Sequence, residues 1–135
     1  TFESAAEART NETYPLQCIG HHYKARVHST FANLEWLKET HPQMLWINPI
    51  DAKKRNISNG DMVEVFNDRG RVRTRAHVTQ RIMPGVTSLP QGAWYKADEN
   101  GVDVGGNINT LTTLHPTAYA KGNAQHTNLV QVEKA

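Results

Sequence analysis

The stretch WINPIDAKKRNISNGDMVEVFNDRGRVRTRAHVTQRIMPG, residues 46–85, decides the fold of this chain. It opens with a short apolar strand, passes through a proline-started helical turn, and reaches an Asn-Gly turn. Two alternating segments joined by Asp-Arg-Gly follow, and Pro84-Gly85 marks a further turn. Short strands separated by tight turns predict a mainly β fold in the form of a small barrel.

The segment 71–78 alternates most clearly. One face carries small or apolar side chains and the other carries basic ones: Val72, Thr74, Ala76 and Val78 against Arg71, Arg73, Arg75 and His77. The basic row is open to three interpretations: a solvated outer face, a site for a polyanion, or a surface for carboxylates of a partner domain. Few aromatic residues accompany it, and stacking on nucleic-acid bases requires them.

The remaining elements are short. Further strands are predicted at 14–20, 44–48, 62–66, 86–89 and 128–132. Short helices are predicted at 33–39 and after Asn48, where Asn48 caps the helix that begins at Pro49. Residues 1–13 are polar and are interpreted as a linker or a disordered terminus, which leaves 14–135 as the domain. The loops at 91–109 and 114–127 are longer than simple connections, and their Gly, Asn, His and Thr content favours a functional role over disorder.

Composition sets outer limits. The chain has 135 residues, 38% of them hydrophobic and 21% charged, which suits one domain with one core. The net charge of +2 is too small to indicate nucleic acid by itself. No apolar run approaches the ~20 residues of a membrane span. The single cysteine, Cys18, has apolar neighbours and is predicted to be buried and unreactive.

The usual catalytic motifs are missing from the sequence. The His residues lack Cys partners and helical metal-ligand spacing, so no metal site is predicted. Neither a G-x-S-x-G elbow nor a phosphate-binding G-x-x-x-x-G-K-[ST] loop is present. Asp98, Glu99 and Asp103 fall in a glycine-bearing loop and are interpreted as solvated surface.

Hydrogen-bonding groups concentrate instead in two loops. The first contains Arg26, His28, Ser29 and Thr30, which together suit a phosphate or a polar heterocycle. The second is GGNINTLT, residues 105–112, whose Asn side chains match the edge of a pterin or purine ring and whose glycines permit close approach of a planar ring. Each cluster alone is also compatible with a solvated loop followed by a helix start.

Together these pieces resemble the C-terminal molybdopterin-dinucleotide-binding domain of the dimethyl sulfoxide reductase family of molybdenum enzymes. The resemblance rests on INPIDA (47–52), NGDMVEV (59–65), RGRV (69–72) and IMPGV (82–86), with RVHST (26–30) and GNINTLT (106–112) at the family's two cofactor loops. The segments HHYKARVHSTF (21–31), LPQGAWY (89–95) and AKGNAQHTNLV (120–130) are most similar to the catalytic subunits of bacterial anaerobic dimethyl sulfoxide reductases.

The resemblance implies a double-psi β-barrel with short helices that binds part of a molybdenum-bis(molybdopterin guanine dinucleotide) cofactor. The implied contacts are Arg26, His28, Ser29 and Thr30 from the first loop, with Asn109, Asn107, Trp94 and Gln125 from later segments. Asn109 is the stronger of the two Asn candidates. Both loops are therefore expected to converge on one mouth of the barrel, and the metal ligand is expected outside this chain.

The same resemblance implies a fragment of an enzyme that reduces S-oxides or N-oxides, such as dimethyl sulfoxide to dimethyl sulfide, in anaerobic respiration. The expected partners are the remaining domains of the same catalytic chain and the iron–sulfur and membrane-anchor subunits of its complex, at the periplasmic face of the bacterial inner membrane. By itself the domain is expected to be inactive, and no nucleic-acid partner is expected. The alternative is a stand-alone double-psi barrel that acts as an interaction or nucleic-acid-binding module.

Overall fold

The computed structural model describes residues 13–22, 34–40, 42–112, 119 and 128–135. Its elements are β1 (Leu16–His21), α2 (Glu35–Thr40), β2 (Met44–Ile47), α3 (Pro49–Lys54), β3 (Met62–Asn67), β4 (Gly70–Val78), β5 (Val86–Pro90), the 3₁₀ helix η1 (Ile108–Thr110) and β6 (Asn128–Lys134). Each predicted strand is present within two residues of its expected bounds. Asn33, the expected cap of α2, and residues 1–12 of the predicted linker lie outside the described residues.

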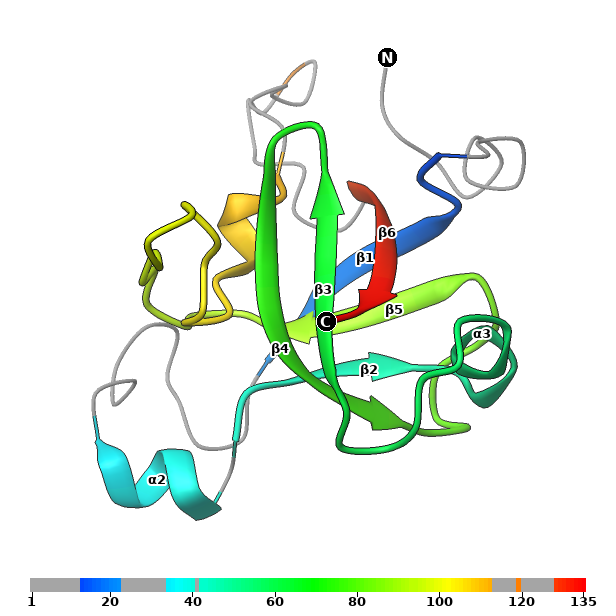
Figure 1. Cartoon of the computed structure of the whole chain (residues 1–135), viewed down its shortest axis with the longest axis horizontal. Helices are drawn as coiled ribbons and strands as arrows, with labels where there is room; N and C mark the ends of the chain where they lie inside the picture. The colour runs from blue at the N-terminus through cyan, green and yellow to red at the C-terminus, as the bar shows by residue number, and fades with distance from the viewer. Residues whose placement is uncertain (1–12, 23–33, 41, 113–118, 120–127) are drawn as a thin grey trace.

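The strands form a closed barrel in the order β1-β5-β2-β4-β3-β6 (Figure 1). Neighbouring pairs β1–β5 and β2–β4 are parallel, and the other neighbours are antiparallel. A closed barrel with two parallel pairs and only short helices confirms the predicted fold class, a mainly β double-psi barrel. Closure also leaves no unpaired sheet edge in the barrel.

The barrel interior is filled by the apolar side of each alternating strand. In β4, Val72, Thr74 and Ala76 are buried whereas Arg75 is exposed, as the alternation predicted. The core is completed by side chains from every barrel strand, from α3 and from η1, including Leu16, Cys18, Leu45, Ile47, Ala52, Val63, Val65, Leu89, Ile108, Leu111, Val130 and Val132. Burial of this apolar area supplies the main driving force for folding.

Helix α3 closes one side of the barrel. The Asn48 side chain accepts from the Ile50 backbone N–H at 2.9 Å and donates to the Ile82 carbonyl at 2.8 Å, so it caps the helix and anchors the turn after β4. The buried Asp51 carboxylate accepts from the Gly85 N–H at 2.7 Å. These bonds fix α3 to the Pro84-Gly85 turn.

Within the part of the chain that the structure describes, no helix has the length and apolarity to span a membrane.

The long segment 91–112, which contains η1, and helix α3 lie on opposite sides of the barrel (Figure 1). Segment 91–112 follows β5 directly and returns to the β3–β4 hairpin through η1, whereas α3 connects β2 to β3. One side of the barrel is therefore built from tight, regular connections, and the other carries irregular chain.

Candidate functional site

The chain segments that follow β1 and β5 leave the barrel at the same place. β1 and β5 are parallel and adjacent, and His21 at the end of β1 is in register with Pro90 at the end of β5. The Gln91 N–H donates to the His21 carbonyl at 3.0 Å, and Gln91 Nε2 lies 2.9 Å from Nδ1 of His22. Parallel strands end on one edge of a sheet, so the loops that follow β1 and β5 begin side by side.

The structure describes three of the eight predicted contact residues. Five of the predicted contact residues lie outside the described residues: Arg26, His28, Ser29, Thr30 and Gln125. Trp94, Asn107 and Asn109 are described, and all three lie in the segment that follows β5. Convergence is therefore observed for the roots of the two loops.

Gln43, which was not among the predicted site residues, joins the two ends of segment 91–106 by hydrogen bonds. Its Nε2 donates to the Pro90 carbonyl at 2.7 Å, where the segment begins, and to the Gly106 carbonyl at 3.0 Å, where it returns. A Cβ at Gly106 would come within 2.6 Å of Gln43 Cγ, and φ at Gly106 is +83°. A glycine is needed at this position for both reasons.

Asp103 corrects the interpretation of the loop carboxylates as solvated surface. Its exposed fraction is 0%, and both oxygens are fully used. Oδ1 accepts from the N–H groups of Lys96 (3.0 Å) and Gly105 (2.8 Å), while Oδ2 accepts from the Asn107 N–H (2.7 Å) and the Thr110 hydroxyl (3.2 Å). The backbone of Asp103 pairs with β4 through bonds to Arg71 and Arg73 of 2.9 and 2.8 Å.

A local signal for this role existed in the sequence. An Asp two residues before a turn position accepts from that residue's N–H, as Asp103 does from Gly105. Asp98 shows the same pattern, with Oδ1 accepting from Asn100 and Val102 at 2.8 and 2.9 Å. What the pattern could not reveal is burial, which comes from the packing of the segment against β4.

The glycines of the second cluster are used inside the protein. A Cβ at Gly105 would lie 2.0 Å from the Trp94 carbonyl oxygen. The close approach that the sequence assigned to a planar ligand ring is therefore made by the chain itself at Gly105 and, with Gln43, at Gly106. The packing of the chain thus requires both glycines, and their role toward a ligand stays a prediction.

The two Asn candidates have different roles. Oδ1 of Asn107 accepts from the Asn109 N–H at 3.0 Å and caps η1. Asn109 is exposed, and its side-chain amide makes no hydrogen bond to another described residue. The Asn109 amide is thus available to a ligand as both donor and acceptor, and it sits on a short helix whose start is fixed. Trp94, 55% exposed, lies in the same segment.

The tip of the β3–β4 hairpin holds the far end of η1. Nε of Arg69 and Nδ2 of Asn67 both donate to the Leu111 carbonyl at 2.9 Å. A Cβ at Gly70 would come within 2.6 Å of Thr110 Cγ2 and 2.7 Å of the Thr110 carbonyl oxygen. Segment 91–112 is consequently anchored at its start by Gln43, in the middle by Asp103, and at its end by the hairpin.

Three rings line the outer wall near the loop roots. Trp46 of β2 lies between His21 of β1 and His77 of β4, with ring centroids 5.0 and 5.5 Å away. Nδ1 of His21 bonds the hydroxyl of Ser88 on β5. Partial burial, with the nearby His22, lowers the pKa of His21 below its usual value. The lowered pKa favours the neutral form of His21, which packs against Trp46 while it bonds Ser88.

Two members of the basic row on β4 form ion pairs within the chain, while the exposed Arg75 donates to the Gly60 carbonyl at 3.1 Å. Arg71 and Arg73 both form ion pairs with Glu64, the latter at 2.9 Å, and Arg73 lies 3.7 Å from Asp98. Hydrogen bonds from Arg71 and then Arg73 lower the pKa of Glu64 below its usual value. Of the sequence's three interpretations of the row, a polyanion site gains no support from this internal neutralisation.

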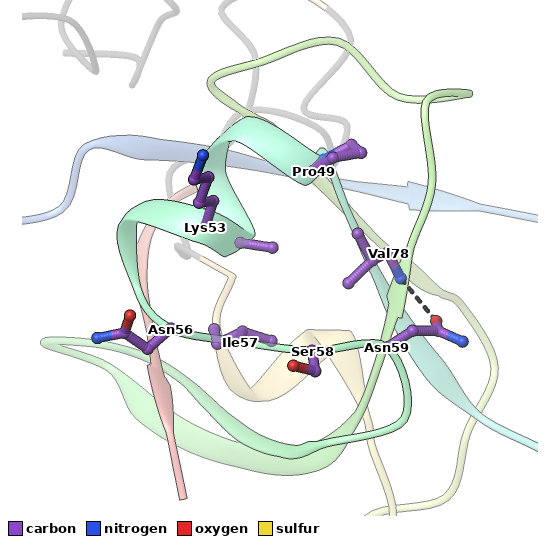
Figure 2. A pocket seen from close by; sticks show the side chains of 8 residues that line it. Pro49, Lys53, Asn56, Ile57, Ser58, Asn59 and Val78 are labelled. Carbon is purple, nitrogen blue, oxygen red and sulfur yellow. Dashed lines mark hydrogen bonds between the residues drawn. The ribbon is translucent and has the colours of Figure 1, made fainter.

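A separate open depression lies beside α3, lined by Pro49, Ala52, Lys53, Asn56, Ile57, Ser58, Asn59 and Val78 (Figure 2). In it the Val78 N–H donates to Asn59 Oδ1 at 3.0 Å. The depression lies away from segment 91–112 and contains none of the predicted site residues. Among the described residues, no group of three His, Cys, Asp or Glu side chains is placed to hold a metal ion.

The structure is thus a closed barrel in which the segments that follow β1 and β5 begin side by side at one end. Residues 16–129 match the molydopterin dinucleotide binding domain family, and the chain belongs to that family.

Relatives agree with this assignment, and a solved structure shares the fold. The chain is 60% identical to the putative dimethyl sulfoxide reductase chain YnfE and to dimethyl sulfoxide reductase DmsA of Escherichia coli K12, over 99% and 98% of its length. It is 38% identical to trimethylamine-N-oxide reductase 1 of the same strain over 92%. It spans only 16–17% of the length of these relatives. The structure superposes on acetylene hydratase from Pelobacter acetylenicus with a TM-score of 0.74 at 16% identity, over 90% of this chain and 18% of that one, which shows a shared fold.

Proposed function

We propose that this chain is the cofactor-binding domain of the catalytic chain of an S-oxide or N-oxide reductase, and that it holds part of a molybdenum-bis(molybdopterin guanine dinucleotide) cofactor. The observation that carries the proposal is the common origin of the two donor-rich loops, at His21 and Pro90 on adjacent parallel strands. Ligands of open sheets and barrels commonly bind where strands of this kind end and their loops diverge.

The residues present fit such a group. Asn109 offers an uncommitted amide to a pterin edge, while Arg26, His28, Ser29 and Thr30 have the donor chemistry for phosphate and polar ring atoms. Trp94 supplies an exposed ring for packing near the cofactor, and Gln125 a further amide. Asn107 would contribute less, because its carbonyl oxygen is engaged in capping η1. The bound cofactor supplies the two-electron redox chemistry, and the domain supplies binding and orientation.

The substrate proposed is dimethyl sulfoxide. Identity to named dimethyl sulfoxide reductase chains is 60%, compared with 38% to a trimethylamine-N-oxide reductase, which favours the S-oxide. The physiological setting proposed is anaerobic respiration.

The proposed partners are the remaining domains of the same chain together with iron–sulfur and membrane-anchor subunits at the periplasmic face of the inner membrane. The support is the small share of each relative that this domain covers, which leaves most of a catalytic chain to be supplied. Because a single loop-bearing barrel end cannot enclose two pterins, the domain alone is proposed to be inactive.

The test compares Asn109→Ala with Asn100→Ala in the full-length enzyme. Both are exposed asparagines of segment 91–112, and Asn100 lies in the Asp98–Gly101 turn. Loss of a ligand hydrogen bond of about 1.4 kcal/mol corresponds to about tenfold weaker retention. Guanine nucleotide released on denaturation, and molybdenum, are measured per polypeptide. We expect both to fall for Asn109→Ala only. Equal, undiminished contents in both variants would count against the proposed site.

A further inference from the structure

Asp103 connects the rigid part of the molecule to the segment that carries the proposed ligand contact. Its backbone is bonded on both sides to β4, through Arg71 O and Arg73 N. Its carboxylate reaches Gly105, Asn107 and Thr110, and these positions flank Asn109 on both sides. The orientation of Asn109 relative to the barrel therefore depends on this side chain, together with the hairpin tip that holds the Leu111 carbonyl.

We propose that Asp103 is a positioning residue for the molybdopterin cofactor, which it never touches: it sets segment 105–110 in its binding conformation before the cofactor arrives. The inference rests on the proposed function of Asn109. A preformed loop lowers the ordering cost of binding, so a loosened loop binds more weakly without losing any direct contact.

The arrangement of donors makes this role specific to a carboxylate. Each oxygen of Asp103 accepts two hydrogen bonds, and within the described residues no Lys or Arg forms an ion pair with it. An amide in its place would turn one oxygen into an N–H₂ group facing at least one backbone N–H. The Thr110 hydroxyl can rotate to accept, but the Asn107 N–H cannot. Asparagine therefore leaves a buried donor unsatisfied in either orientation.

Asp98 provides the matched control. It lies in the same segment and caps its turn with Oδ1 alone, through Asn100 and Val102. Its Oδ2 lies 3.7 Å from the half-exposed Arg73 guanidinium. Asparagine at 98 can keep both turn bonds and lose only this surface ion pair, which contributes little.

The experiment uses the full-length enzyme with Asp103→Asn, Asp98→Asn and Asn109→Ala. Hydrogen exchange of the cofactor-free protein, made in cells that do not synthesise the cofactor, reports loop order directly. We expect Asp103→Asn to lower protection of amides 105–110 by about tenfold while β4 stays protected. Guanine nucleotide retained by the holoenzyme should fall as in Asn109→Ala. Asp98→Asn should match wild type in both measurements.

The outcomes separate the two proposals. Full retention and unchanged protection in Asp103→Asn, with loss in Asn109→Ala, would overturn the positioning role and leave the cofactor site intact. Full retention in both variants would remove the cofactor site itself.

Two milder variants at Thr110 test the same role if Asp103→Asn fails to fold. Thr110→Val removes one donor to Oδ2, whereas Thr110→Ser retains it. About threefold lower protection of amides 105–110 in the valine variant alone supports the proposal, and wild-type protection in that variant contradicts it.

Discussion

The barrel wall and segment 91–112 are ordered by different physics. The wall, represented by β2, β3 and β4, is ordered by burial of alternating apolar side chains such as Leu45 and Val65, each 0% exposed. Segment 91–112 also contributes Ile108 and Leu111 to the core, but its course between β5 and η1 is set by the polar bonds of Gln43, Asp103 and the hairpin tip. The comparison teaches that a segment with little regular structure can still adopt one conformation when its polar anchors are buried and fully hydrogen-bonded.

Leu45→Ala should give the largest effect and should act on the wall. Removing a fully buried leucine leaves a cavity and costs about 3 kcal/mol of unfolding free energy. Met62→Ala, at a side chain 37% exposed, should cost less than about 1 kcal/mol. Urea unfolding of the chain measures both. Equal losses of unfolding free energy in the two variants would contradict the placement of Leu45 in the core and of Met62 at the surface.

Gly105→Ala should act on the segment. The added methyl meets the Trp94 carbonyl oxygen at 2.0 Å, and backbone cannot move aside as a flexible side chain can, so a cost of about 2 kcal/mol is expected. Gly101→Ala meets nothing within 4 Å and suffers only the strain of φ = +77°, about 1 kcal/mol. Hydrogen exchange of residues 93–107 should accelerate much more for the first variant. If Gly105→Ala accelerated exchange in β4 as much as in residues 93–107, the distinction between the segment and the barrel wall would be contradicted.

Glu64→Gln tests the polar bonding on the outer wall. The folded pKa of Glu64 is depressed, so its contribution is complete above the unfolded value, about 4.3, and disappears as pH falls through the folded value. Because the Arg partners are partly exposed, the ion pairs of Glu64 contribute only about 1 kcal/mol to the free energy of unfolding at pH 7. Unfolding free energies at pH 7 and pH 3 for this variant and for Glu99→Gln, an exposed control, measure it. A difference that does not shrink between pH 7 and pH 3 would assign the effect to packing.

Cys18 offers the smallest perturbation, because it needs no substitution. Burial raises the pKa of its thiol to about 12, and the side chain is 0% exposed, so the reactive thiolate is scarce and enclosed. Iodoacetamide at pH 8 should leave the native protein unlabelled and label it in urea. Native labelling as fast as in urea would mean that the wall between β1 and β5 opens readily.

Much of the fold was predictable from local pattern. The alternation in β3 and β4, the Asn48 cap, and the burial of Cys18 are each set by neighbours within a few positions. Asn109 was likewise recognisable as a candidate from its motif, though its contact with a cofactor stays a prediction. Asp103 was misjudged because a carboxylate among glycines usually lies in solvent. Gln43 was missed because its partners, Pro90 and Gly106, are 47 and 63 positions away.

The sequence by itself determined the strands, the turns, the inward face of the barrel and the family to which the chain belongs, because periodicity and turn chemistry act over short distances. Tertiary structure alone decided that β1 and β5 end side by side, at His21 and Pro90, and that Asp103 is fully buried. Both depend on the pairing of β1 with β5 and on the packing of residue 103 against β4, and burial of a polar group is a property of its surroundings rather than of its residue type.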